Sequence, residues 1–560
     1  MHVAFTTDDE GARPVFAWVL RHLLTCRGWF PETSKAVSER TVTIHYGDAQ
    51  SPPEAGEAPG PLLLIDRGSA PFSAPPPPPG KARAPEGREL LVSYPDAGAG
   101  RPAGGRTIWT REDGSGLATL ESASDSTGRS IVTLSADVVH PAAFLVTRNE
   151  ERNGPRDSLD RFDPAGSWLA KHGLLETPVV DEIGWLFHDL LRRLLESSGS
   201  WSACRSPWPA GRSHAIAITH DQDQSIRWER RLARHTLGAL RGPDRRRQVA
   251  LLLRDLREGA VSPVLMTDRL LRWERERNVE ATYFFLTVPR DRFGRRYDVS
   301  SAPFRRLLGA MRSEGHSVGL HGSLRTCGDG DLFERERARI GDVLGSPPAG
   351  VRQHYLRIQL PETWALQQKA GFRYDASLGF PDQPGFRAGT SYPFPPENMP
   401  SFLAIPLTGM DRALLARGLT TPEAWHEWAA PARRAEGLVD VLWHPYFVDS
   451  DLGPDRERAT IAMLDWASSS GAWVAGLDRI DEWWRARNAF RMIETGVAAG
   501  EERIVFRADA PIRELALTLE GADSDIRIAG TDGIEARWSG ARITVDAEAG
   551  GTMTLSRKKR

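Results

Sequence analysis

Two carboxylates stand at the end of an apolar run in the sequence. Residues 214–220 read HAIAITH, and Asp221 and Asp223 follow with a single glutamine between them. Successive side chains of a strand alternate between its two faces, so Asp221 and Asp223 would point the same way. Paired carboxylates suit metal binding and general-base catalysis. A polar turn at the end of a strand is the alternative interpretation.

Further strand-like runs end in side chains of the same kind. His321 follows HSVGL, Arg352 and His354 lie in VRQHYLR, Asp375 lies in FRYDASLGF, and His444 ends LVDVLWH. In a parallel α/β barrel the ends of the strands meet at one face, where functional residues gather. Acids, imidazoles and a guanidinium at that face are what a metal-assisted hydrolase needs. We therefore expect these side chains to converge.

The elements that must position them alternate along the middle of the chain. Strand-like runs are separated by helical patterns, and they lie at 279–286, 316–320, 349–353, 402–407, 438–444 and 472–476. Strand–helix alternation predicts a parallel sheet, and over this length it favours a closed α/β barrel, for which we set bounds of 206–495.

The two regions that flank this central part have different patterns of strand-like and helical runs. Residues 1–205 mix strand-like runs (41–47, 61–68, 89–95) with helical patterns (16–24, 183–199), which predicts an accessory α/β domain with an exposed proline-rich loop at 73–87. Residues 496–560 hold six runs of period 2, among them 525–530, 534–540, 541–547 and 552–558. These runs predict a small antiparallel β-sandwich.

Composition excludes several classes of protein. The 560 residues are 40% hydrophobic and 26% charged with a net charge of −2, which is typical of a globular protein and gives no global attraction for nucleic acid. Three scattered cysteines indicate neither a disulfide framework nor a cysteine-based zinc site. The sequence contains no run of eighteen apolar residues, so no membrane-spanning helix is predicted. The first residues lack the pattern of a signal peptide, so a cytoplasmic location is expected. The oligomeric state stays open.

Motifs in the central region resemble those of the NodB-homology polysaccharide deacetylases, carbohydrate esterase family 4. These motifs are THDQD, GLHGS, VRQHYLR, YDASLGF and GFRAGT. They are similar, more narrowly, to a bacterial subgroup with a THDVD-type first motif, and FLVTRNEERNGPRDSLDRF with LAKHGLLETPVVDE resembles the domain that precedes its barrel. The resemblance covers roughly residues 130–490. It implies a distorted (β/α)7 barrel that removes N- or O-acetyl groups from sugars with one divalent metal ion.

The resemblance implies a role for each matching residue. Asp221 matches the catalytic base, Asp223 and His321 match metal ligands, and Arg352 matches an arginine that pairs with the base and keeps it ionised. Gln222 is a departure, because the commoner form of the family has adjacent aspartates.

The remaining roles include a second departure. Asp375 matches the acid that orients the catalytic imidazole, and His444 matches the imidazole that protonates the leaving group. Arg325 takes the position of the family's second metal-binding imidazole, but arginine has no lone pair for a metal. We predict that His354, at the end of the neighbouring strand, is the third ligand of a Zn²⁺ ion. A histidine packed over the barrel mouth is the alternative.

Three residues complete the predicted site as substrate contacts: Arg387, Tyr355 and Trp443. Arg387 lies in the loop GFRAGTSYPFPP, where it would bind an anionic group of the substrate or belong to a rigid surface loop. The predicted function is metal-dependent removal of acetyl groups from a sugar or polysaccharide precursor. N-acetyl groups are favoured over O-acetyl groups as the target. The alternatives are a catalytically impaired carbohydrate-binding or assembly protein and an amidohydrolase acting on a linear amide.

Overall fold

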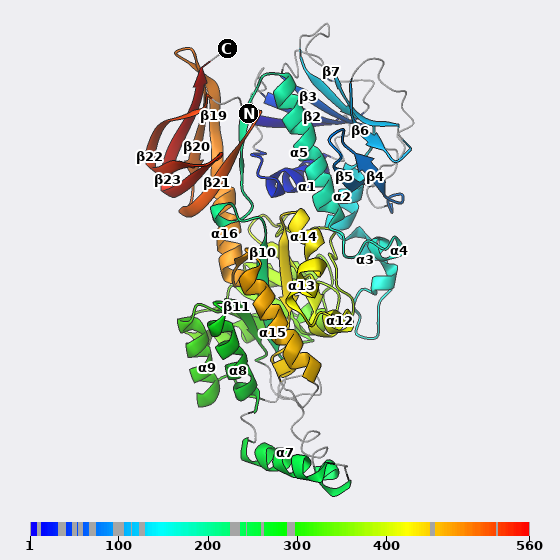
Figure 1. Cartoon of the computed structure of the whole chain (residues 1–560), viewed down its shortest axis with the longest axis vertical. Helices are drawn as coiled ribbons and strands as arrows, with labels where there is room; N and C mark the ends of the chain where they lie inside the picture. Colours follow the sequence, from blue (N-terminus) through cyan, green and yellow to red (C-terminus); the bar gives the residue numbers. More distant parts are fainter. Residues whose placement is uncertain are drawn as a thin grey trace.

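The computed structural model describes residues 2–7, 13–31, 41–47, 53, 60–66, 74–92, 106–113, 115–121, 129–223, 236–241, 244–258, 262–287, 297–448, 454–521 and 525–558. These residues form three β-sheets with helices packed on them (Figure 1). Within these ranges no helix combines the length and the apolar character that crossing a membrane requires.

The first sheet belongs to the N-terminal region and has the strand order β1-β2-β3-β8-β7-β6-β4-β5. Its strands are β1 (His2–Thr7), β2 (Thr41–Gly47), β3 (Leu62–Asp66), β4 (Gly80–Arg83), β5 (Glu89–Val92), β6 (Arg106–Arg111), β7 (Gly116–Glu121) and β8 (Ile131–Leu134). The pairs along β1-β2-β3-β8 are parallel, and the others are antiparallel. Three helices pack their apolar faces against this sheet and form one hydrophobic core with it: α1 (Arg13–Cys26), α2 (Val139–Val146) and α5 (Val179–Ser197).

The proline-rich segment is only partly the loop that its composition predicts. Residues 75–79 have no regular structure, but residues 80–83 form β4, which pairs with β5 and β6. The difference arises because GKAR, after the last proline, again has backbone N–H groups that can donate to neighbouring strands. Residue 73 and residues 93–95 of a predicted strand lie outside the described residues.

The second sheet is the central one, with the order β15-β14-β13-β12-β11-β10-β17-β16 and β18 paired with β10. Every pair in it is parallel. Its strands are β10 (Ala215–Gln222), β11 (Ala281–Phe285), β12 (Ser317–Gly322), β13 (Gly350–Gln353), β14 (Tyr374–Leu378), β15 (Leu403–Pro406), β16 (Gly409–Met410), β17 (Leu438–Leu442) and β18 (Trp473–Val474).

Helices lie between most of these strands along the chain and cover the sheet (Figure 1). They are α8 (Ser262–Glu276), α9 (Ala302–Ser313), α10 (Gly330–Leu344), α11 (Glu362–Lys369), α12 (Asp411–Ala416), α13 (Pro422–Trp428), α14 (Ala430–Arg434), α15 (Pro454–Ser469) and α16 (Leu477–Ala489). All eight residues of β10 are buried, which explains why its sequence is a continuous apolar run rather than an alternating one.

The central sheet closes on itself into a barrel-like arrangement. Its edge strands β15 and β16 stand at opposite ends of the order, yet only Leu407 and Thr408 separate them along the chain. The N–H of Leu407 donates to the carbonyl of Leu378 in β14, and that of Thr408 donates to the carbonyl of Asp440 in β17. Strand β16 was not predicted, because two residues are too few to show a pattern.

The third sheet has the order β19-β20-β23-β21-β9, with β22 paired to β23. Its strands are β9 (Ser202–Arg205), β19 (Phe490–Ala498), β20 (Glu501–Ala508), β21 (Ile512–Glu520), β22 (Arg527–Ser539) and β23 (Arg542–Lys558). Four runs predicted as separate strands are instead the two halves of β22 and the two halves of β23. The chain bends at Gly533 and Gly550, with φ of 62° and 88°, and both halves of the hairpin share one apolar core.

Two short helices, α3 (Asn149–Arg152) and α4 (Trp168–Lys171), lie between α2 and α5 along the chain. They stand beside the barrel in Figure 1.

Candidate active site and metal centre

Five of the predicted side chains meet at the carboxyl ends of neighbouring parallel strands. Asp221 lies near the end of β10 and Asp223 directly after it, while His321 lies in β12. His354 follows β13, and His444 lies two residues after β17. Adjacent parallel strands end at the same edge of a sheet. Residues more than two hundred positions apart in the sequence, such as Asp223 and His444, therefore lie close together in space.

Asp223, His321 and His354 form one of two groups of side chains in the described residues that could hold a metal ion. His321 Nε2 lies 2.8 Å from Asp223 Oδ1, and His354 Nε2 lies 3.5 Å from the same oxygen. One ligand atom from each residue lies within 4.8 Å of the other two. His354 thus lies beside Asp223 and His321, and its role as a metal ligand stays a prediction.

The donor atoms of this group suit a cation. His321 Nδ1 lies 2.9 Å from the backbone oxygen of Arg352, which can only accept, so the neutral imidazole carries its proton there and keeps a lone pair on Nε2. Within the described residues, neither that Nε2 nor Asp223 Oδ1 has a hydrogen bond of ordinary geometry, although both are buried. Converging lone pairs of this kind fit a divalent ion of the Zn²⁺ type.

The backbone after β13 turns sharply to place His354. Tyr355 and Leu356 have φ of 63° and 55°, in the left-handed region that residues other than glycine rarely adopt. Each such residue costs about 1–3 kcal/mol, and such strain gathers at functional sites. The turn brings the ring of His354 to 4.9 Å from that of His321. Tyr355 is 39% exposed and its ring lies 4.1 Å from that of His354, so it remains a predicted substrate contact.

Arg352 lies beneath the site and binds two carboxylates. Its Nη1 is 3.5 Å from Asp221 Oδ1 and donates to Thr219 Oγ1 at 2.6 Å, whereas its Nη2 donates to Asp440 Oδ2 at 2.9 Å. The predicted partner Asp221 is thus present, but Asp440 of β17 is nearer. Burial raises the pKa of Asp440 to about 6, and the charge of Arg352 opposes that rise. A lone acid within the apolar run LVDVL was the signal in the sequence.

His444 is held by a carboxylate that sequence reasoning missed. Its Nδ1 lies 2.6 Å from Asp411 Oδ2, and its backbone N–H donates to the same oxygen at 2.8 Å. Its Nε2 points into the site, 3.2 Å from Asp223 Oδ2. Burial alone would lower the pKa of His444, but electrostatic interactions with Tyr446 and with the carboxylates of Asp411 and Asp223 outweigh it and raise the pKa well above its usual value. Asp411 begins α12, where an acid looks like an ordinary helix start.

Asp375 does not contact His444, which corrects the role predicted for it. Its carboxylate accepts hydrogen bonds from the backbone and hydroxyl of Ser377 at 2.9 and 2.6 Å and from Gln367 Nε2 at 2.8 Å. Trp364 Nε1 donates to it at 3.3 Å. Gln367 and Trp364 belong to α11, so the side chain points from β14 towards the covering helix rather than into the barrel mouth.

Trp443 also faces away from the site, so the substrate contact predicted for it is corrected. The side chain is fully buried, its Nε1 donates to Thr460 Oγ1 at 2.8 Å, and its ring packs on Trp425 and Phe447. Neighbouring side chains point to different faces, and the chain presents His444 to the site and Trp443 to the core.

Arg387 is a buried structural cation, which corrects its predicted role in binding an anionic substrate. Only 2% of the residue is exposed, and its Nε and Nη2 donate to the two carboxylate oxygens of Glu151 at 2.8 and 2.6 Å. Arg148 Nε donates to Glu151 Oε1 at 2.8 Å. Burial would raise the pKa of Glu151, but the charges of Arg387 and Arg148 prevail and lower it to about 2. This cluster joins α3 to the barrel loop.

The two departures from the family motifs do not disturb the cluster. Gln222 points the opposite way from its aspartate neighbours, and its Oε1 accepts from Thr267 of α8 at 2.8 Å. Arg325 is exposed and lies outside the group of donor atoms.

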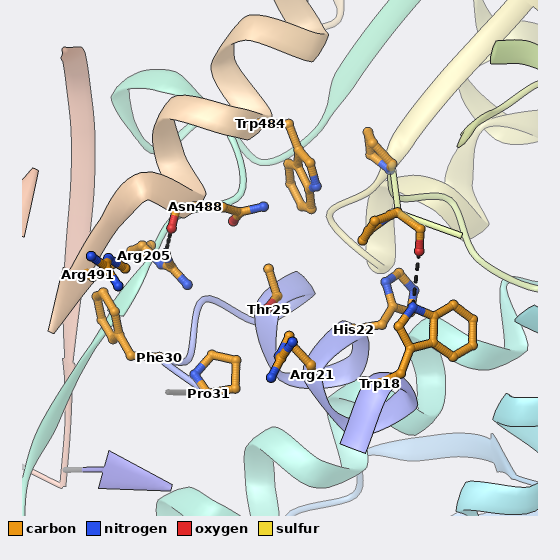
Figure 2. A pocket seen from close by; sticks show the side chains of 12 residues that line it. Trp18, Arg21, His22, Thr25, Phe30, Pro31, Arg205, Trp484, Asn488 and Arg491 are labelled. Atoms are coloured by element: carbon orange, nitrogen blue, oxygen red, sulfur yellow. Dashed lines mark hydrogen bonds between the residues drawn. The ribbon is translucent and has the colours of Figure 1, made fainter. Parts of the chain in front are cut away.

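A cavity of about 510 Å³ lies elsewhere in the molecule (Figure 2). Its walls come from α1, the segment 393–395, α16 and β19, and none of the predicted site residues lines it. It contains Arg21, Arg205 and Arg491, but Arg205 donates to backbone carbonyls and Arg491 pairs with Asp509. The acid–histidine cluster of Asp221, Asp223, His321, His354 and His444 lies outside this cavity.

A model for a family of unknown function, DUF7033, matches residues 107–196. No curated protein matches the chain.

Solved structures resemble part of the chain. A protein from Mycobacterium smegmatis described as a polysaccharide deacetylase is 19% identical, with 52% of this chain and 96% of that chain covered and a TM-score of 0.33. The Puue allantoinase is 14% identical, with 50% and 93% covered and a TM-score of 0.34. The chitin deacetylase of Colletotrichum lindemuthianum is 13% identical, with 49% and 89% covered and a TM-score of 0.27.

Proposed function

We propose that this chain is a metal-dependent hydrolase that removes acetyl groups, N-acetyl rather than O-acetyl, from a sugar or a polysaccharide precursor. The observation that carries the proposal is the convergence of three kinds of group at one barrel mouth. A set of lone-pair donors (Asp223, His321, His354) lies beside a buried carboxylate (Asp221) and an imidazole held by an acid (His444). The motif order described above favours acetylated sugars among the substrates of such a site.

The proposed ion has one chemical task. Bound by Asp223, His321 and His354, a Zn²⁺ ion would polarise a carbonyl and lower the pKa of water from 15.7 towards about 7. The second group of donor atoms, from Asp221, Asp223 and His444, shares only Asp223 with the first. We assign the ion to the first group because Asp411 already holds His444 through its other nitrogen, which suits proton transfer, and Arg352 lies beside Asp221.

The protein side chains carry the proton transfers. Asp221, whose Oδ1 lies 3.5 Å from Arg352 Nη1, would accept a proton from the water that attacks the acetyl carbonyl carbon. His444, oriented by Asp411, would donate a proton to the sugar nitrogen as the C–N bond breaks. The products are acetate and a free amine.

Acetate release from N-acetylated oligosaccharides, measured with metal content on the same preparation, tests the proposal. We expect turnover that a chelator abolishes and Zn²⁺ restores, and we expect Asp223→Ala to lose both metal and turnover. His426→Ala removes an exposed histidine of α13 and serves as the control, with both properties unchanged. Metal binding without turnover on any acetylated sugar would favour a binding protein, and turnover confined to linear amides would favour an amidohydrolase of another class.

A further inference from the structure

Exposed apolar side chains gather on one projecting helical hairpin. Of the nine large apolar side chains that are exposed in the described part of the chain, five lie on it: Leu237, Leu240, Val249, Leu253 and Leu256. The hairpin consists of helical residues 236–241 and α7 (Arg245–Glu258). A Cβ atom on Gly238 would come within 2.8 Å of the side chain of Gln248, so the two helical pieces contact each other. Figure 1 shows α7 standing apart from the barrel.

The exposed apolar side chains of α7 form a face. Val249, Leu253 and Leu256 follow the spacing i, i+4, i+7, which places them on one side of α7, and they are 43%, 62% and 57% exposed. Leu237 and Leu240 are one turn apart on the first helical piece and are 55% and 65% exposed. A patch of this kind on a water-soluble surface marks a site of interaction with a protein or a membrane.

The charge of the hairpin distinguishes between these partners. From Thr236 to Glu258 the sequence holds six arginines and three acidic residues, a net charge of +3 in a chain whose total is −2. Arg241, Arg245 and Arg246 are exposed beside the leucines. Basic residues next to an apolar helical face are typical of helices that lie in the interface of an anionic membrane. A nucleic acid would bind to the arginines but would not bury the leucines.

The hairpin is also placed at the functional end of the barrel. It belongs to the connection from β10 to α8, so it follows the strand end that carries Asp221 and Asp223. We propose that the 236–258 hairpin is a membrane-docking element that inserts its leucines into an anionic lipid surface and so turns the barrel mouth towards that surface. The proposal does not depend on the reaction that the site performs.

Vesicle co-sedimentation of the full chain tests the proposal that the 236–258 hairpin docks on a membrane. Binding to vesicles with roughly one third phosphatidylglycerol should be at least about tenfold tighter than to pure phosphatidylcholine, and it should weaken at high salt. Replacing Leu237, Leu240, Leu253 and Leu256 by Ser should reduce binding about tenfold or more, because insertion scales with buried apolar area. The matched control replaces Ile493 and Val497 of β19, exposed by 39% and 44%, with Ser and should bind as the unmodified protein does.

A labelled residue provides a second readout that does not depend on the stability of the multiple variant. The three native cysteines are buried, so Leu253→Cys can be labelled selectively with an environment-sensitive dye, with Val497→Cys as control. Only the label at position 253 should shift to the blue with anionic vesicles. Equal binding to neutral vesicles, undiminished binding of the serine variant, or a dimer that the serine variant abolishes would overturn the proposal, the last by making the face a contact between two copies.

Discussion

Asp411 Oδ2 lies 2.6 Å from His444 Nδ1 and also accepts the backbone N–H of His444 at 2.8 Å. One oxygen thus fixes both the ring and the main chain of the residue that follows β17. The consequence is geometric: Nε2 is the ring nitrogen left to face Asp223 and the substrate. Asp411 and His444 are 33 residues apart in the sequence, and the pairing of β16 with β17 brings them together.

Replacing Asp411 by Asn should lower kcat without unfolding the protein. The amide keeps the size of the side chain but loses its charge, and loss of an orienting carboxylate typically costs about 10–100-fold. KM and the melting temperature should change little, and Asp411→Glu should recover part of the rate. Asp375→Asn is the contrast: it should lower the melting temperature, because Asp375 accepts four buried hydrogen bonds. If Asp375→Asn alone affected kcat, the assignment of Asp411 would be wrong.

Metal content should separate the two groups of donor atoms that share Asp223. With the ion assigned to Asp223, His321 and His354, His354→Ala should lose most of the bound metal, whereas His444→Ala should retain it. Elemental analysis of the purified variants, dialysed against the same zinc buffer, gives the answer. The opposite pattern would move the ion to Asp221, Asp223 and His444.

Asp221→Asn should retain the metal and lose turnover. The amide can still accept a hydrogen bond but cannot take up a proton, and removing a positioned general base costs about 10²–10⁴-fold in rate. The variant should bind Zn²⁺ in the same ratio as the unmodified protein, since Asp223 and not Asp221 is assigned to the ion. Undiminished acetate release would exclude Asp221 as the base.

Acid should destabilise the fold through Glu151. Its pKa in the folded protein is about 2, below the usual 4.5, so the stabilising contribution is fully present above pH 4.5 and is lost as the pH falls towards 2. A shift of this size corresponds to about 3 kcal/mol. Urea unfolding at neutral pH and near pH 3 should show a smaller loss of stability for Glu151→Gln than for the unmodified protein. Identical losses for the two proteins would show that the cluster with Arg148 and Arg387 does not carry this dependence.

Much of the fold followed from the sequence because local patterns reflect local geometry. Strand β2 coincides with the run 41–47, and the barrel strands follow the apolar runs because parallel strands are buried on both faces. The bends in β22 and β23 were read as breaks, because a glycine in a strand pattern marks either a turn or a bend and the sequence does not distinguish them.

At the site, local sequence patterns identify the strand ends that carry acids and imidazoles, and alternation along β10 puts Asp221 and Asp223 on one face. The packing of distant segments sets which of these groups meet. It paired His444 with Asp411 rather than Asp375, gave Arg352 a nearer partner in Asp440, and buried Arg387 against Glu151. The physical reason is that periodicity fixes the face on which a side chain stands, whereas a hydrogen-bond partner depends on register, helix packing and chain closure between segments that no local pattern relates.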